Sequence, residues 1–403
     1  MIKKTWLKFL WPFYVHNIFR SISKLIMPFY MVYLLHIWLN LWQIALIWSF
    51  RSIIGLVFEI PTWAIADLYW KKFSVILWYI LTWISVFFIP FFHWFIWIVI
   101  IFCINAFSET LFSWADAARV SDVIEENDKN IMNSYFSWIR SIRNFWSIIA
   151  WILWSFVAKY LGMDWLWYIF WIWTIISSLF LLFAKDGKKW YEEEPEWWLK
   201  KDFWEHIKGS FDYIRKHKIV LFLFLWIALF YLTDEMTWLA WTPYIQQLWF
   251  NIENLWYIYS IIGIGWILVP LIAEKVLKFK NPANVIFWVC LWFAVLLIFS
   301  GISSSILLII SLFVLYNFVD DFILPIEETI TNKFLDKKKR STLLSIKSMV
   351  ESLSSIIWWP LAGMLLWYIT LSQWLLVWAW FMILMWIIYK IVWFFLQKEK
   401  RVN

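Results

Sequence analysis

The sequence predicts an all-α polytopic membrane protein with about 12 transmembrane helices, arranged as two six-helix repeats. Three observations lead to this fold class. The 403 residues are 64% hydrophobic and have a mean hydropathy of +0.70, which lies outside the range of soluble domains. Apolar runs of about 20 residues, the length that a helix needs to cross a bilayer, recur along the chain. Lysine and arginine gather in alternate connections between these runs.

The apolar runs define the expected helices in chain order. They lie near 11–36, 43–66, 73–90, 94–118, 138–158, 165–184, 219–245, 253–278, 283–300, 304–326, 343–367 and 372–395. The longest polar segment separates the first six runs from the last six, and its part Phe203–His217 has apolar residues at helical spacing. We therefore expect an N-terminal bundle at 1–184, a cytoplasmic linker with an amphipathic helix at 185–218, and a C-terminal bundle at 219–403.

The basic residues predict the orientation of the chain in the membrane. Lys3 and Lys4 precede the first run, Lys71 and Lys72 follow the second, and the run Lys337–Arg340 follows the tenth. Short connections rich in lysine and arginine stay in the cytoplasm, so both termini are expected there, in a multi-pass protein of the plasma membrane. This asymmetry explains the net charge of +7 without a nucleic-acid partner.

Signals of a soluble enzyme are not found in the sequence. Cys103 and Cys290 fall in separate apolar runs without a CxxC pair, the five histidines are scattered, and no phosphate-binding loop is present. We therefore expect no catalytic residues, no cofactor and no metal.

The connection between the second and third runs, Phe58–Lys72, holds a carboxylate and a basic pair. It resembles the loop between helices 2 and 3 of major facilitator superfamily (MFS) transporters, whose pattern is Gly-x-x-x-Asp-basic-x-Gly-basic-basic. Asp67, Lys71 and Lys72 match this pattern, whereas Leu68 replaces a basic residue. The resemblance covers nearly the whole chain and implies the MFS fold and transport by alternating access.

The resemblance also implies a role for Asp67 in conformational change. A carboxylate at the inner end of helix 2 can attract the positive N-terminus of helix 11 and a neighbouring cation, for which Arg119 is the candidate. Such a latch would hold the outward-open state. The alternative is a solvated aspartate beside membrane-surface lysines.

Tryptophan stands where the loop pattern calls for glycine. Trp63 and Trp70 occupy both glycine positions, and the chain has 40 Trp but only 8 Gly. Similar exchanges occur at Trp114, Trp249, Trp256, Trp358 and Trp359. We hypothesise that UGA codons were translated as Trp whereas the source reads them as glycine. The alternative is a protein that is truly rich in tryptophan, as the aromatic belts of membrane proteins are.

The resemblance implies that helices 1, 4, 7 and 10 line a central cavity. The polar residues of these helices are Arg20, Lys24, Asn105, Glu109, Asp234, Glu235, Asn317, Asp320 and Asp321. Carboxylates that outnumber cations in a medium of low dielectric constant tend to bind protons near neutral pH. The hypothesis is proton-coupled export in which one or more of Asp234, Glu235, Asp320 and Asp321 carry protons. Alternatively, Arg20 and Lys24 only neutralise acids between helices.

Two further groups of ionisable residues are embedded in apolar runs. Arg51 lies in the second run, and Lys347 and Glu351 lie four residues apart in the eleventh, a spacing that predicts an ion pair within one helix.

The function predicted from these features is secondary active transport of a small solute, with a drug-like amphiphile as cargo of a proton antiporter. The expected partners are the solute, protons and the lipid bilayer, and the expected state is a monomer. The open alternatives are the permease subunit of an ATP-driven pump and a polytopic membrane enzyme or receptor.

Overall fold

The computed structural model describes residues 4–23, 27–69, 71–112, 115–127, 131–184, 212–251, 254–279, 282–334 and 340–400. The linker 185–211, with most of the predicted amphipathic helix at 203–217, lies outside the described residues. Some side chains within the helices also lie outside the description, and they are identified below where a predicted site includes them.

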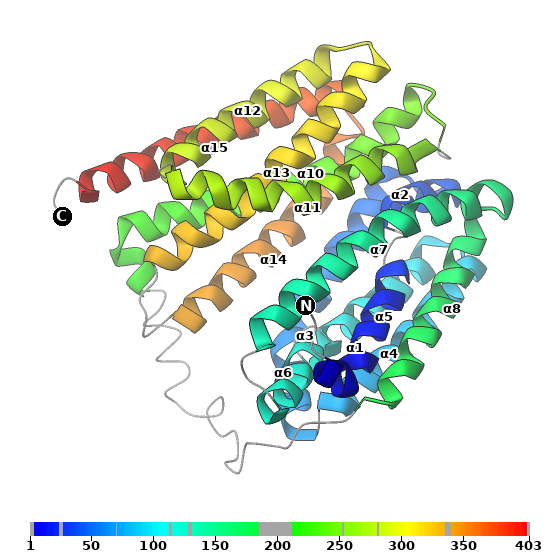
Figure 1. Cartoon of the computed structure of the whole chain (residues 1–403). Helices are drawn as coiled ribbons and strands as arrows, with labels where there is room; N and C mark the ends of the chain where they lie inside the picture. Colours follow the sequence, from blue (N-terminus) through cyan, green and yellow to red (C-terminus); the bar gives the residue numbers. More distant parts are fainter. Residues whose placement is uncertain are drawn as a thin grey trace. The chain divides into compact units, whose positions relative to one another are not determined.

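The described chain consists of helices and short turns, drawn in chain order in Figure 1. The helices before the linker are α1 (Lys4–Ser23), α2 (Met27–His36), α3 (Leu41–Tyr69), α4 (Lys71–Phe88), the short helix η2 (Ile89–Phe91), α5 (Phe95–Phe112), α6 (Ala115–Asn127), α7 (Met132–Tyr160) and α8 (Met163–Leu182). The remaining helices are α10 (Lys218–Gln247), α11 (Leu255–Phe279), α12 (Pro282–Ile302), α13 (Ile306–Phe334), α14 (Arg340–Leu365) and α15 (Leu371–Lys400). A helix satisfies its own backbone hydrogen bonds, which a bilayer interior requires.

The helices form two compact units. Unit 1 comprises 1–40, 50–195 and 252–263, and unit 2 comprises 41–49, 196–251 and 264–403. The first residues of α3 thus belong to unit 2, and the first residues of α11 belong to unit 1. The division into two six-helix bundles at 184 and 219 stays a prediction.

Unit 1 is built around the packing of α1 on α8 and of α4 on α5. Its core includes Phe13 from α1, Trp78 from α4, Phe112 from α5 and Ile124 from α6. These apolar and aromatic side chains are buried. The polar contacts inside the unit are exceptions in this apolar core.

Unit 2 is built around α15, which packs against α12 and α10, while α10 also packs against α14. Trp226 of α10 stacks on Phe230 and contacts Tyr389 of α15. At the start of α3, the Trp42 backbone approaches Gly363 of α14 so closely that a Cβ on this glycine would lie 2.9 Å from the Cα of Trp42. This approach requires glycine at 363.

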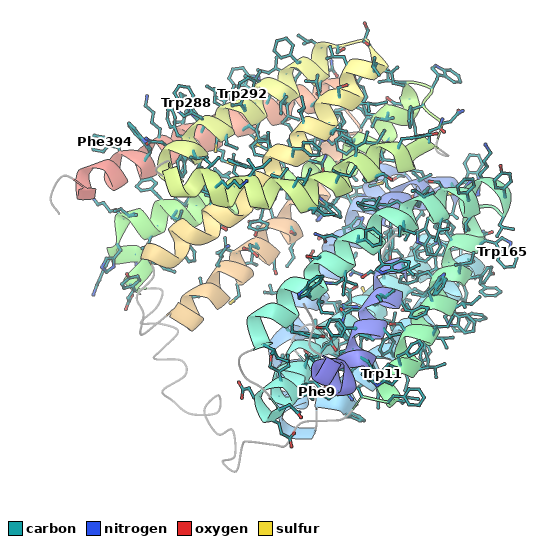
Figure 2. The ribbon with its side chains drawn as sticks, viewed as in Figure 1. Phe9, Trp11, Trp165, Trp288, Trp292 and Phe394 are labelled. Atoms are coloured by element: carbon teal, nitrogen blue, oxygen red, sulfur yellow. The ribbon has the colours of Figure 1, made fainter. Side chains whose placement is uncertain are left out.

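The outer faces of the helices carry apolar and aromatic side chains that suit a lipid environment. Trp288 and Trp292, one turn apart on α12, are 58% and 59% exposed, and Phe394 of α15 is 62% exposed. Figure 2 shows these side chains pointing outward, together with Trp11 and Trp165 on unit 1. Among the described residues, eight helices are long and apolar enough to cross a membrane. The polytopic membrane fold predicted from the apolar runs is confirmed.

The boundaries differ from the prediction at two places that matter for the site. The tenth predicted span ended at residue 326, whereas α13 continues to Phe334. The eleventh was expected from residue 343, whereas α14 begins at Arg340. Both helices therefore extend into sequence that the hydropathy pattern had assigned to a loop.

Two described residues other than glycine have positive φ angles, Trp38 at 68° and Trp249 at 64°. Both follow the C-terminus of a helix, and both side chains are almost fully exposed.

Candidate functional site

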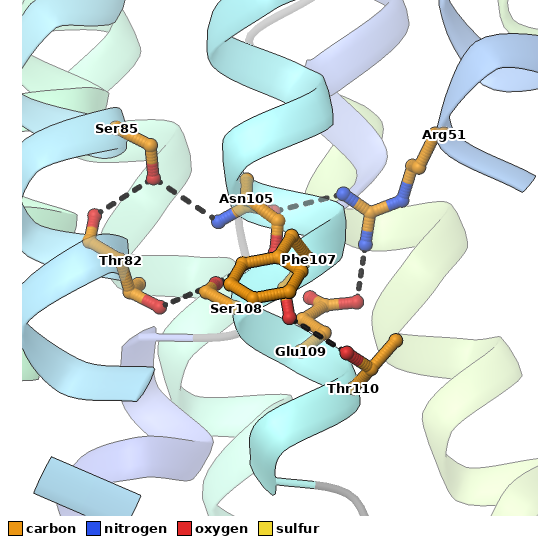
Figure 3. Close-up of polar contacts among 8 residues, drawn as sticks. All are labelled: Arg51, Thr82, Ser85, Asn105, Phe107, Ser108, Glu109 and Thr110. Atoms are coloured by element: carbon orange, nitrogen blue, oxygen red, sulfur yellow. Dashed lines mark hydrogen bonds and ion pairs between the residues drawn. The ribbon is translucent and has the colours of Figure 1, made fainter. Parts of the chain in front are cut away.

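A polar network in unit 1 joins α3, α4 and α5 and is drawn in Figure 3. Its cation is Arg51 of α3, whose Nη1 donates a hydrogen bond of 2.8 Å to Oδ1 of Asn105. The Nη2 of the same guanidinium forms an ion pair with Oε2 of Glu109. Asn105 and Glu109 lie one turn apart on α5, so the planar guanidinium contacts both acceptors from one side.

The network continues from Asn105 toward α4. Nδ2 of Asn105 donates to Oγ of Ser85 at 3.4 Å, and Ser85 donates to the carbonyl oxygen of Thr82 at 3.0 Å. The Thr82 and Ser108 hydroxyls lie 3.1 Å apart, and Ser108 donates to the carbonyl oxygen of Asn105. The helices are otherwise apolar, and each of these polar groups has a hydrogen-bond partner. These hydrogen bonds fix the orientation of the Asn105 side chain.

The two ends of the ion pair differ in exposure. The Arg51 side chain is 19% exposed, whereas the Glu109 side chain is 54% exposed. The carboxylate therefore keeps an open face that can accept hydrogen bonds from a bound solute. The predicted residues Asn105 and Glu109 are thus in one cluster, and the embedded Arg51 is their cation.

A second polar group in unit 1 surrounds His16 of α1, which is fully buried. Its Nδ1 lies 2.9 Å from Oγ of Ser177 on α8 and 3.0 Å from the hydroxyl of Tyr79 on α4. One turn along α1, the Arg20 guanidinium lies 3.8 Å from the ring centre of Phe112. This predicted cation therefore packs on an aromatic face inside unit 1. Lys24, its predicted companion, lies outside the described residues.

In unit 2, Lys347 of α14 contacts two carboxylates. Its Nζ lies 2.8 Å from Oε2 of Glu327 on α13 and 3.7 Å from Oε1 of Glu351. The predicted pair within α14 is present, and Glu327 is the closer partner. Sequence reasoning missed Glu327, because the residue lies just beyond the end of the tenth predicted span.

The remaining cavity candidates lie on α10 and α13. Asn317 donates to the carbonyl oxygen of Phe313 on its own helix at 2.9 Å, and Asp320 and Asp321 are half-buried. Asp234 and Glu235 lie in α10, but their side chains are outside the description.

The residues of the loop motif lie at the junction of α3 and α4. Asp67 is in the last turns of α3, and Lys71 and Lys72 begin α4, but these side chains and that of Trp63 are outside the description, as is all of Trp70. The latch between Asp67 and Arg119 stays a prediction.

Arg119, the proposed cation of that latch, is 2% exposed in α6. It donates hydrogen bonds to the carbonyl oxygens of Ala184 at 3.1 Å and Leu181 at 3.5 Å. Leu181 lies in the last turn of α8 and Ala184 lies two residues past its end, so the Arg119 side chain joins α6 to the C-terminal end of α8.

No protein-family model and no curated protein matches the sequence. The fold, in contrast, is similar to solved transporters. The nucleoside transporter NupG has a TM-score of 0.78 at 14% identity, over 94% of this chain and 97% of that chain. A POT family transporter in complex with a thioalcohol conjugated peptide has a TM-score of 0.74 at 15% identity, over 96% of each chain. An auto inhibited POT family peptide transporter has a TM-score of 0.74 at 12% identity, over 94% of this chain and 96% of that chain.

At these identities the likeness shows the fold alone. It covers nearly the full length of each protein, so the chain has the MFS type of fold that the loop motif led us to expect.

Proposed function

We propose that the chain is a secondary active transporter that moves a small solute across the membrane by alternating access. The observation that carries the proposal is the network of Arg51, Asn105 and Glu109 on apolar helices of a transporter-like fold. Ionisable side chains at membrane depth are costly, and they usually mark a pathway for a solute or an ion. Here the exposed Glu109 carboxylate offers an acceptor, and the half-buried Arg51 guanidinium offers a positive charge.

In this proposal the network orients the solute in unit 1. Glu109 accepts hydrogen bonds or a positive charge from the solute, and Arg51 with Asn105 holds the carboxylate in place. Arg20, Lys24 and Asn317 are further candidates for the solute pathway. The similar structures are those of a nucleoside transporter and peptide transporters, and both cargo classes carry several hydrogen-bonding groups.

Proton-coupled export is the proposed direction and coupling. The predicted cavity helices hold more acids than cations, so proton binding to Asp234, Glu235, Asp320 or Asp321 would lower the charge that the bilayer must accommodate. In the proposed antiport, a drug-like amphiphile is exported as protons enter. Asp67, Lys71 and Lys72, with Arg119 and the positions of Trp63 and Trp70, form the proposed conformational motif.

Purified protein in vesicles tests this proposal. A library of nucleosides, dipeptides and cationic dyes would first be screened for solutes that raise the melting temperature, and the hits would be followed for transport under an imposed pH gradient. We expect efflux above that of empty vesicles for at least one hit, and loss of that efflux in Arg51→Ala and Glu109→Ala.

Asp164→Asn is the matched control for these variants. It also changes an ionisable side chain, but Asp164 is exposed near the start of α8 and accepts a hydrogen bond from Tyr33, which an amide oxygen can still do. Rates equal to those of empty vesicles for every stabilising solute would contradict the proposed function.

A further inference from the structure

The cluster of Lys347, Glu327 and Glu351 in unit 2 carries more negative than positive charge. Glu327 is 1% exposed, Lys347 is 11% exposed and Glu351 is 25% exposed. A structural ion pair needs one acid for one ammonium group, and here two acids share it. With both acids ionised, these three groups carry one excess negative charge around the buried Glu327, where such a charge is costly. One bound proton removes it.

The geometry distinguishes the two acids. Glu327 is the closer partner of Lys347 and is almost fully buried, so its charge is balanced by the ammonium group. Glu351 is farther from Lys347 and more exposed, so water can deliver a proton to it. Tyr231 of α10, the helix that packs against α14, forms a side-chain hydrogen bond with Glu351.

Other acids lie near this cluster in the chain. Asp320 precedes Glu327 by seven residues on α13, which places both on one face of that helix. Asp234 and Glu235 follow Tyr231 by three and four residues on α10. They are the competing proton carriers, and any test must include them.

We infer that Glu351 is a proton-binding residue, and that Lys347 and Glu327 are positioning residues that set its charge balance. Binding adds a proton to a carboxylate oxygen of Glu351 and leaves Lys347 paired with Glu327 as a neutral pair. The coupling of this proton to cargo rests on the proposed function, whereas proton binding itself does not.

Infrared difference spectroscopy of the purified full chain tests proton binding without any solute. The carbonyl band of a protonated carboxylic acid should grow as the pH is lowered. We expect Glu351→Gln to remove part of this band. Glu327→Gln should shift the Glu351 contribution to lower pH, because the Lys347 ammonium group then stabilises the charged form of Glu351 alone. Asp164→Asn should leave it unchanged.

Two results would overturn the inference. One is a band with the same amplitude and pH dependence in wild type, Glu351→Gln and Glu327→Gln. The other is loss of the band in the amide variant of Asp234, Glu235, Asp320 or Asp321 instead. If the band behaves as expected but the pH gradient drives no solute, the proton site stands and the proposed function fails.

A second inference concerns tryptophan, and the turn after α2 carries it. The backbone nitrogen of Trp38 donates to the carbonyl oxygen of Leu35, and that of Leu39 donates to the carbonyl oxygen of Leu34, both at 3.1 Å. These two bonds form a Schellman motif with Trp38 at the C′ position. Its φ of 68° suits glycine and costs other residues about 1–2 kcal/mol.

The turn after α10 repeats this arrangement in unit 2. Trp249 donates to the carbonyl oxygen of Gln246 at 3.0 Å, and Phe250 donates to that of Ile245 at 3.3 Å. Trp249 thus occupies C′ with a φ of 64°. Trp38 and Trp249 are 92% and 94% exposed, so packing of the indole does not offset the backbone cost.

Buried indoles give a separate observation. Native proteins leave few buried donors without a hydrogen bond. Among the described residues, buried indole nitrogens without a hydrogen-bond partner include those of Trp78, Trp83, Trp167, Trp241, Trp358, Trp374, Trp378 and Trp386. The core accommodates these rings sterically, but it does not satisfy their donors.

We infer that the residue at 38 and at 249 is glycine in the protein made by its source, and that UGA codons at these positions are read as glycine there. The same reading would restore both glycines of the loop motif at 63 and 70. It also agrees with the finding that the fold matches known transporters whereas the sequence matches no family model.

The codons at these positions decide whether the source protein has glycine or tryptophan there. The masses of the corresponding peptides provide an independent check. We expect UGA at 38, 249, 63 and 70, and glycine masses for the corresponding peptides of protein purified from its source. UGG codons at 38 and 249, or indole masses in those peptides, would overturn the inference.

Discussion

The two units surround a cation on a helix with different acceptors. In unit 1, the guanidinium of Arg51 contacts one neutral amide and one carboxylate that is 54% exposed. In unit 2, the ammonium of Lys347 contacts two carboxylates, one of them only 1% exposed. The first cluster is balanced in charge and open on one side. The second has an excess acid and is largely closed.

This difference teaches which cluster suits which ligand. A balanced pair with an exposed carboxylate can bind a solute without a change of its own charge. A buried group with one acid too many gains most from the smallest cation, a proton. The proposed solute binding in unit 1 and the proposed proton binding in unit 2 are therefore compatible with each other, and the variants below separate them.

The largest effect is expected for Lys347→Met. Removal of the ammonium group leaves Glu327 buried without its cation, which should lower the free energy of unfolding by about 3–5 kcal/mol. Denaturant unfolding in detergent measures this. Lys347→Arg should keep most of the stability, and adding Glu327→Gln to Lys347→Met should recover part of the loss. If Lys347→Met is as stable as wild type, the buried Glu327 does not depend on its cation, and the contrast drawn between the two units is wrong.

Arg51→Leu should have a smaller effect. It removes the hydrogen bond to Asn105, which is worth about 1.5–3 kcal/mol because one partner is charged, and the weaker ion pair with the exposed Glu109. Glu109 can reach water, so its charge is not left buried. The same unfolding measurement applies, and a loss larger than that of Lys347→Met would reverse the order proposed for the two clusters.

A third comparison uses the matching turns of the two units. Trp38→Gly and Trp249→Gly should each raise the free energy of unfolding by about 1–2 kcal/mol, because glycine adopts positive φ without strain. Trp380→Gly is the control, since Trp380 is 73% exposed in the middle of α15 and glycine there should lower stability by about 1 kcal/mol. A loss of stability in both turn variants would count against the tryptophan inference.

The smallest effect on stability is expected for Glu109→Gln. Because this carboxylate is 54% exposed, its ion pair with Arg51 should contribute less than about 1 kcal/mol. The Glu109→Gln variant should nevertheless transport the solute much more slowly than wild type. The pH dependence of its carboxylic-acid infrared band should be unchanged. A change in that titration would show that the two clusters share one role.

The fold was predictable from the sequence because a bilayer imposes few choices. Runs of apolar residues gave the helices, and the loop at 58–72 gave the family resemblance. The pairing of Arg51 with Asn105 joins residues 54 positions apart, so no spacing rule could reveal it. Arg119 likewise contacts the end of α8, which depends on how α6 packs in unit 1.

Glu327 shows why the candidate site was only partly predictable. Hydropathy ended the tenth span at 326, since the following residues are polar, and the acid was assigned to a loop. In the structure, α13 continues to Phe334, and Glu327 is buried because Lys347 of the next helix neutralises it. A polar residue can therefore belong to a membrane helix when its partner lies on another element, and that partner is not visible in a hydropathy window.

The turn at Trp38 has a practical consequence for producing this protein. If its codon is UGA, an ordinary laboratory bacterium would stop translation there and release a peptide that ends at Ile37, before α3 has begun. A synthetic gene with glycine codons would avoid both the truncation and a bulky ring at a backbone reversal. Biochemistry on this protein therefore starts with the design of its gene.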